Sequence, residues 1–219
     1  MWSNLYENLN TWGYQKQDYD NKIPTSNIVN GKPVYYFFDK KDQVIDNLDA
    51  GHITLAWCDN VTLILSNSTN GDPIYLDYTM NSVVENCKAS NNFGGIFLYI
   101  SANNDIINNT FSNNYYGILL EFNSNATITY NDIISNKYGV WSGGGSDPTI
   151  HNNTISGNTE YGVKNEDSGV YIHAEYNYWG ASDGPWKDGG DEPWPYYWYG
   201  SGDDVSNYVY FYPYLSSPP

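Results

Sequence analysis

The chain of 219 residues contains no arginine: its nine basic side chains are all lysines, and 25 acidic side chains outnumber them. The formal net charge is −16, which would repel nucleic acid and anionic membrane surfaces. We therefore expect neither as a partner. Such an acidic surface suits an extracellular, cell-surface or high-salt setting.

Long hydrophobic runs are also missing, so we expect no part of this segment to insert into a membrane. Met1 is followed by Trp2 and Ser3, without the charged start and apolar stretch of a signal peptide. We interpret the chain as an excerpt of a longer secreted or surface protein, or as one whose signal has been removed.

Cysteine is scarce, with Cys58 and Cys87 as the two examples. In the repeat described below, Cys87 takes the position that Asn109 holds one repeat later, whereas Cys58 falls near Thr79. A disulfide needs Cα atoms within about 7 Å. The spacing therefore predicts two separate buried thiols, which do not settle the redox compartment.

What the chain does contain is an internal repeat of 22 residues, running from about residue 72 to residue 160. Glycine and apolar residues recur in aligned columns. These columns are Gly95, Gly117 and Gly139; Ile74, Ile96, Ile118 and Val140; Leu76, Leu98 and Leu120; and Val84, Ile106, Ile128 and Ile150. A fixed period of this length indicates stacked structural units.

Within each repeat the apolar residues stand two apart, which is the spacing of a strand with one buried face. No repeat has the spacing of an amphipathic helix. Three short strands per 22 residues predict an all-β, single-stranded parallel β-helix of about six coils. We divide the chain into an irregular N-terminal lead-in or partial coils (1–49), the β-helix repeats (50–180) and an aromatic, Pro- and Gly-rich C-terminal cap (181–219).

Two asparagine columns accompany the apolar ones. Asparagine tolerates the left-handed backbone that a sharp corner needs, and stacked amides can hydrogen-bond along a column. We therefore expect two asparagine ladders at the corners. The columns are Asn92, Asn114, Asn136 and Asn158; and Asn109, Asn131 and Asn153.

The repeated pattern N-x-I/F-S-x-N-x-x-G-I-x-L resembles the right-handed parallel β-helix repeats of the pectate-lyase-like superfamily, and it is most similar to NosD-type repeats of archaeal and bacterial surface proteins. The closing segment from Asn177 to Leu215 is similar to a terminal segment that many such proteins share. The resemblance implies a right-handed solenoid. That superfamily includes lyases, hydrolases, adhesins and assembly factors, so the resemblance specifies fold more than function.

A stripe of large residues should face outward, because side chains alternate along each strand. Aromatic rings flanked by carboxylates suit stacking on sugar rings, so we predict contact with a glycan or with another protein chain here. The alternative is that the stripe packs against the lead-in or a second subunit. The predicted binding residues are Tyr75, Phe97, Tyr99, Leu119 and Trp141.

Asp77 and Glu121 would stand two rungs apart on this face, about 9.6 Å between backbones. That spacing lies near the carboxylate separation of inverting glycosidases, which makes the pair a weak catalytic candidate. The lyases that the repeat resembles use an arginine or lysine base beside calcium-binding aspartates. This chain has no arginine, and the repeat region offers only Lys88, Lys137 and Lys164 on scattered columns, so we exclude that activity.

No cofactor is expected to be required, although calcium is possible, because oxygen ligands on flexible loops suit that ion. The weak calcium candidates are Asp183, Asp188, Asp191, Glu192, Asp203 and Asp204. His151 and His173 are 22 residues apart and could stack in adjacent coils, which suggests a copper site as a remote alternative.

Five N-x-[ST] triplets favour an extracellular or cell-surface location, where such asparagines can be glycosylated. They begin at Asn60, Asn67, Asn108, Asn125 and Asn152. Our first interpretation is a non-catalytic adhesive or structural module. The alternatives are a glycoside hydrolase using the paired carboxylates and a subunit that self-assembles into a filament or surface layer.

Overall fold

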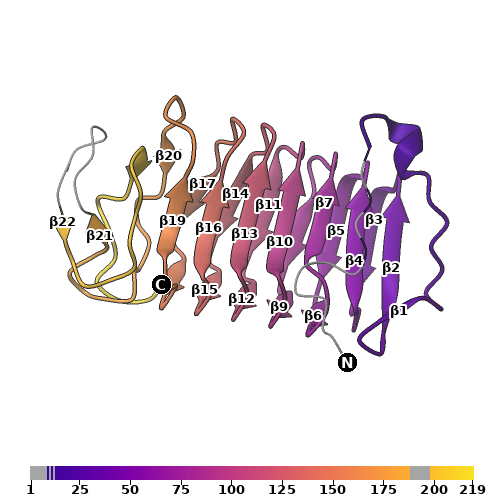
Figure 1. Cartoon of the computed structure of the whole chain (residues 1–219), viewed down its shortest axis with the longest axis horizontal. Coiled ribbons are helices and arrows are strands. Elements are labelled where there is room, and N and C mark those ends of the chain that lie inside the picture. Colours follow the sequence, from indigo (N-terminus) through magenta and orange to yellow (C-terminus); the bar gives the residue numbers. More distant parts are fainter. Residues whose placement is uncertain (1–8, 10, 12, 188–197) are drawn as a thin grey trace.

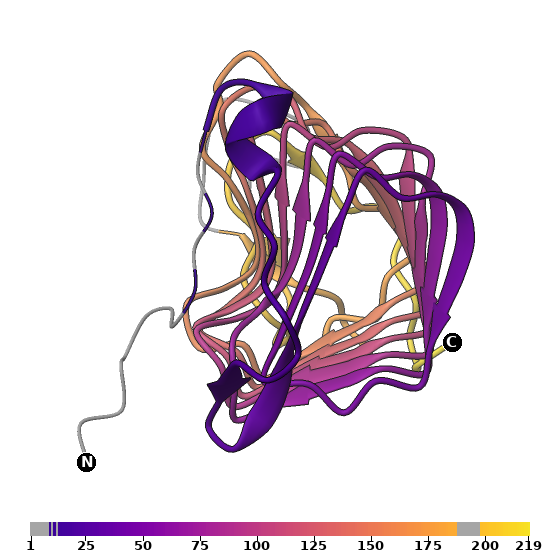
Figure 2. The same cartoon turned by 90° about the vertical axis from the view of Figure 1, so that its right-hand side faces the viewer.

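The computed structural model describes residues 9, 11, 13–187 and 198–219. These residues form a β-solenoid of about six coils with a period of about 22 residues, which confirms the predicted fold class. Figure 1 shows the coils side by side, and Figure 2, turned by 90°, shows them stacked behind one another. The helical structure in the described part is one short 3₁₀ turn, η1 (Lys16–Tyr19).

The five coils from β4 to β18 each contribute one strand to each of three sheets, and the coils at the two ends contribute to the first two sheets. The first sheet contains, in order, β1 (Ile28–Val29), β2 (Lys32–Phe38), β4 (His52–Ala56), β7 (Ile74–Asp77), β10 (Gly94–Tyr99), β13 (Tyr116–Glu121), β16 (Tyr138–Ser142) and β19 (Tyr161–Asn165). Its strands are parallel except for β1, which pairs antiparallel with β2.

The second and third sheets close the other two sides. The second contains β3 (Lys41–Asp46), β5 (Asp59–Ile64), β8 (Val83–Glu85), β11 (Asn104–Ile107), β14 (Ala126–Thr129), β17 (Thr149–His151), β20 (Ile172–His173) and β23 (Val209–Tyr210). The third contains β6 (Asn67–Thr69), β9 (Lys88–Ser90), β12 (Thr110–Ser112), β15 (Asp132–Ile134) and β18 (Thr154–Ser156).

Residues one period apart lie directly over each other. Ile96 pairs with Ile74 on one side and with Ile118 on the other, and all three are fully buried. Glycine is needed at each position of its column because neighbouring coils approach closely there. A Cβ at Gly117, for example, would lie 2.5 Å from the carbonyl oxygen of Gly139. The interior is thus a continuous apolar core.

The asparagine ladders form as predicted, with one correction. Asn131 is buried; its Nδ2 donates to the Ile106 carbonyl (2.8 Å), and its Oδ1 accepts the backbone N–H of Asn109 (2.9 Å). The left-handed backbone falls on the residue before each ladder position, as at Asn108 (φ +55°) and Asn113 (φ +56°). At each of these corners, therefore, one residue adopts the left-handed conformation that turns the chain, and the next residue forms hydrogen bonds between neighbouring coils.

Regular coils begin earlier than residue 50. β2 pairs with β4 and β3 with β5, so residues 32–46 already belong to the solenoid. At the other end, Val205, Val209 and Phe211 join the core and close the last coil, with the antiparallel pair β21 (Trp186–Lys187) and β22 (Trp198–Tyr199) beyond it (Figure 1). The exact division into three segments stays a prediction.

Both thiols are free and buried, as predicted from the spacing. The backbone N–H of Cys87 donates to Asn109 Oδ1 (2.8 Å), which confirms that Cys87 takes a ladder position. Burial raises the pKa of the Cys87 thiol to about 11. It is therefore protonated at neutral pH and inert as a nucleophile.

Candidate functional site

The outward stripe on the first sheet is largely covered. Tyr75, Phe97 and Leu119 form a second apolar cluster outside the solenoid and are 2%, 1% and 6% exposed. This burial corrects the expectation that they contact a ligand at the surface. Tyr99 and Trp141 are only partly buried, so these two predicted binding residues remain accessible.

The residues before β1, which alone are called the lead-in from here on, dock on this side of the first sheet. The backbone N–H of Leu9 donates to Asp72 Oδ2 (3.1 Å), and the Tyr36 hydroxyl donates to the carbonyl of Tyr19 (2.7 Å). The Tyr19 ring is buried and meets the edge of Tyr78, with centroids 5.6 Å apart. The lead-in is thus packed against the solenoid. Such packing was the alternative to ligand contact that we expected for the outward stripe.

A cleft of about 320 Å³ opens between the lead-in and strands β7, β10 and β13. We call it the lead-in cleft. Asp77, Tyr99 and Glu121 are consecutive partners in the register of these strands. The residues that line it include Tyr14, Asp77, Tyr78, Tyr99, Glu121 and Phe122. Three residues singled out from the sequence thus meet in one cleft.

The two carboxylates of the cleft differ in environment. Glu121 is half-buried, and this burial raises the pKa of its carboxyl above the usual value. Asp77 is 4% exposed. Burial and then the negative charge of Asp77 raise the pKa of the Tyr19 hydroxyl, which places Asp77 against the lead-in.

Beyond the cleft, a row of tyrosine rings continues along the sheet. Tyr116 stacks on Tyr138, with centroids 5.6 Å apart, and Tyr138 stacks on Tyr161 at 6.4 Å. Trp141 meets the edge of Tyr138 at 4.7 Å, and the Lys137 ammonium lies 5.3 Å from the centre of the same ring. All four rings are partly exposed. They extend the accessible surface from β13 to β19.

Sequence reasoning missed this tyrosine row, although its signal is visible. Each of Tyr116, Tyr138 and Tyr161 directly precedes a glycine of the repeated column. Tyr14, by contrast, belongs to a segment without periodicity. Nothing in its sequence context could have placed it at the cleft.

A buried polar group at the first coils was also missed. His52 Nδ1 lies 2.9 Å from Asp72 Oδ2, and His52 Nε2 contacts Thr54 Oγ1 at 2.5 Å. All three side chains are at most 1% exposed. Because Asp72 also accepts the Leu9 N–H, the group anchors the lead-in rather than facing a ligand.

The described calcium candidates make structural hydrogen bonds. Asp203 accepts the backbone N–H of Asn158 (2.9 Å) and so extends the first asparagine ladder, while Asp183 accepts from the backbone and hydroxyl of Ser201. These bonds to Ser201 lower the pKa of Asp183. Burial, then the charge of Asp203, raises the pKa of Asp204.

Within residues 9, 11, 13–187 and 198–219, no three His, Cys, Asp or Glu side chains form a group that could hold a metal. Asp188, Asp191 and Glu192 lie outside the described residues. Calcium binding stays a prediction.

The two histidines are not in register, because His173 pairs with Thr149. The spacing between paired residues grows from 22 to 23 at β19, where Val140 pairs with Val163, and to 24 at β20. Both imidazoles instead approach Glu175: His151 Nε2 lies 3.2 Å from one carboxylate oxygen and His173 Nδ1 lies 3.0 Å from the other. The predicted stacking is therefore wrong, and a carboxylate lies between the two rings.

The five glycosylation candidates lie on the outward side of the coils. Asn60, Asn108 and Asn125 are exposed, whereas Asn67 and Asn152 are half-buried. In the described part of the chain, no helix is long and apolar enough to cross a membrane.

These features define a class of protein: a parallel β-solenoid with a lead-in packed across one sheet and a partly exposed aromatic row beside it. The family model described as a right handed beta helix region matches residues 38–178. The chain belongs to this right-handed β-helix family, as the repeat pattern predicted. Neither the curated proteins nor the solved structures provide a significant match. Membership supports a structural or binding module.

Proposed function

We propose that this chain is a non-catalytic module that binds carbohydrate in the lead-in cleft and along the adjoining aromatic row. The observation that carries the proposal is the lining of the cleft, where the partly exposed ring of Tyr99 lies in register between the carboxylates of Asp77 and Glu121. Aromatic faces pack against the apolar side of a sugar ring, and carboxylates accept hydrogen bonds from its hydroxyls.

The size of the cleft agrees with such a ligand. Its volume of about 320 Å³ lies at the lower end of the range for small-molecule sites. A single sugar ring would fit there, and the row Tyr116, Tyr138 and Tyr161 would support further sugars along the sheet.

We place this module outside the cell or on its surface, as an adhesive or structural element. The acidic charge of −16 and the exposed asparagines Asn60, Asn108 and Asn125 support this setting. A partner protein chain on the same face, or self-assembly of the solenoid, are the competing uses of the surface.

A glycan array with the wild type, Tyr99→Ala and Trp141→Ala tests the proposal. We expect the wild type to bind at least one glycan class and each variant to bind about three- to tenfold more weakly, since an aromatic contact contributes roughly 0.5–1.5 kcal/mol. Leu65→Ala is the matched control, because Leu65 is 57% exposed and lies away from the cleft. Absence of any wild-type signal would remove the glycan proposal.

A second candidate function is glycoside hydrolysis. It is favoured by two carboxylates in one cleft, one of them with a raised pKa, as a general acid requires. Reducing-sugar release from polysaccharides that disappears in both Glu121→Gln and Asp77→Asn would establish it. Binding without release in the wild type would leave the non-catalytic module.

A further inference from the structure

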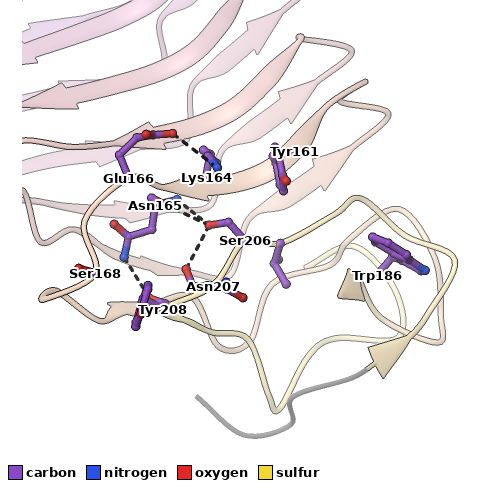
Figure 3. Close-up of a pocket in the computed structure, with 10 residues that line it drawn as sticks. Tyr161, Lys164, Asn165, Glu166, Ser168, Trp186, Ser206, Asn207 and Tyr208 are labelled. Carbon is purple, nitrogen blue, oxygen red and sulfur yellow. Dashed lines mark hydrogen bonds and ion pairs between the residues drawn. The ribbon is translucent and has the colours of Figure 1, made fainter. Parts of the chain in front are cut away.

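A second hollow lies at the far end of the same sheet, where β19 faces the C-terminal segment (Figure 3). We call it the cap pocket. Its volume is about 470 Å³, and the residues important here are Tyr161, Lys164, Glu166, Trp186 and Asn207. Figure 3 shows Tyr161 and Lys164 on the strand and Trp186 on the C-terminal side.

Trp186 offers an exposed platform. Its side chain is 37% exposed, although most large apolar residues of the chain are buried. Trp186 borders a second, shallower hollow next to Gly200 and Asp204 as well as the cap pocket. Trp186 thus lines both hollows and is partly exposed, which leaves side-chain surface available for stacking.

The charged groups of the cap pocket balance each other. Lys164 Nζ lies 3.5 Å from a carboxylate oxygen of Glu166 and 4.9 Å from the centre of the Tyr161 ring. Both charged side chains are partly exposed, at 26% and 43%, so their hydrogen-bonding capacity is open to a ligand. The described lining thus offers a donor, an acceptor and aromatic surface, with one positive and one negative side chain.

The cap pocket continues the accessible row that starts at the lead-in cleft. Lys164 pairs in register with Trp141, and Tyr161 stacks on Tyr138. Strand β19 lies two rungs of the solenoid, a distance of about 10 Å, from Glu121 on β13. One extended ligand can therefore reach both places.

We propose that the cap pocket is a second carbohydrate subsite, in which a neutral sugar ring stacks on Trp186 and hydrogen-bonds to Lys164 and Glu166. The inference rests on the proposed function, which it extends from a single sugar to a neutral polysaccharide spanning both places. An acidic sugar is disfavoured, because the lead-in cleft carries two carboxylates, its described lining contains no lysine, and the chain has a net charge of −16.

Affinity electrophoresis tests this subsite with soluble β-glucan, galactomannan and xylan as neutral probes and polygalacturonate as the acidic one. The proteins are the wild type, Tyr99→Ala, Trp186→Ala and Trp186→Phe. Tyr130→Asn is the control, because Tyr130 is 58% exposed elsewhere and its φ of +56° suits asparagine. Circular dichroism checks that each variant retains the solenoid.

We expect at least one neutral polymer to retard the wild type, with polygalacturonate having no effect. Trp186→Ala should bind about three- to tenfold more weakly. Trp186→Phe should recover most of the affinity, since it restores a ring, and Tyr130→Asn should match the wild type.

Four outcomes would overturn one or both proposals. If Tyr99→Ala weakens binding and Trp186→Ala does not, the second subsite is wrong and the lead-in cleft stands. The reverse result keeps the cap pocket and removes the cleft. If polygalacturonate retards the wild type as strongly as the neutral polymers do, the proposal that the ligand is a neutral polysaccharide is wrong. If no polymer retards the wild type, both proposals are wrong.

Discussion

At the scale of single residues, the buried asparagines hold neighbouring coils together through polar rather than apolar contacts. Asn131 is 1% exposed, and its amide group satisfies backbone groups of Ile106 and Asn109 on another coil. A backbone group that loses its partner in such an interior has no access to water. The ladders thus determine the corner conformation as strictly as the isoleucine columns determine the core.

We predict that Asn131→Ala lowers the free energy of unfolding by at least about 2 kcal/mol, since each orphaned buried group costs roughly 1–3 kcal/mol. Urea unfolding followed by circular dichroism measures the loss. Asn125→Ala is the control: Asn125 also accepts a backbone N–H from the neighbouring coil, that of Asn103 (2.7 Å), but it is exposed, so water can replace this bond and stability should change by less than about 0.5 kcal/mol. Equal losses in the two variants would mean that the ladder adds nothing beyond a surface asparagine.

The surroundings of Glu175 predict how the stability of the protein depends on pH. Burial pushes the pKa of its carboxyl upward, but hydrogen bonds from His173, from its own backbone and from His151 outweigh this and lower it. A lowered pKa in the folded state stabilises the protein above the ordinary carboxyl pKa. That contribution is lost as the pH falls through the lowered value.

The melting temperature of the wild type should therefore fall toward acid pH more steeply than that of Glu175→Gln. At pH 7 the variant should be the less stable of the two, and the difference should shrink at strongly acid pH. Glu160→Gln, at an exposed position, is the matched control and should follow the wild type. Parallel curves for the wild type and Glu175→Gln would contradict the role of this carboxylate.

At the scale of elements, the lead-in has few anchors compared with a coil. Its described contacts with the solenoid include the Leu9 hydrogen bond, the ring of Tyr19 and a 2.6 Å ion pair between Lys16 and Asp39. Segments with few buried contacts open at lower free energy than the core. The lead-in is thus expected to open without unfolding of the solenoid.

We predict that Tyr19→Ala releases the lead-in locally. Hydrogen exchange at the Leu9 amide, which donates to Asp72, should become at least about tenfold faster, while amides of β10 and β13 keep their protection. Exchange at Leu9 equal to that of the wild type would show that Tyr19 is not an anchor.

The period predicted the register correctly, because every coil gives its residues the same neighbours: Ile96, Ile118 and Val140 lie over one another. It could not identify which residues outside the repeat would line the cleft on the outward face, as Tyr14 and Tyr19 do. A non-repeating segment carries no positional signal.

The same reason explains the errors at the C-terminal end. Asp203 completes a ladder that begins at Asn92, yet it follows Asn158 by 45 residues and has a different side chain. Two extra residues, one before Val163 and one between Val163 and His173, bring His173 opposite Thr149. Wherever the spacing departs from 22, side-chain contacts have to come from the structure.

At the scale of the whole molecule, the net charge of −16 destabilises the folded chain by self-repulsion. Added salt screens exposed charges, with a Debye length of about 10 Å at 0.1 M. We predict that the melting temperature rises as sodium chloride is increased from low to moderate ionic strength. Thermal unfolding across a salt series measures the change.

The control for this salt effect is a variant that removes three exposed negative charges. Asp46→Asn, Asp132→Asn and Asp147→Asn together should make the melting temperature less dependent on salt, since all three aspartates are exposed. A melting temperature that is independent of salt in the wild type would show that the acidic surface carries no energetic cost.

The register between neighbouring coils has a consequence for variation in length. Because β10, β13 and β16 present equivalent hydrogen-bonding edges, residues 116–137 could be excised and β10 would then meet β16 with Ile96 opposite Val140. The shortened solenoid would lose one rung of about 4.8 Å and keep both ends intact. Duplication of the same 22 residues would lengthen it by one rung, so the distance between the two ends can evolve in whole-coil increments.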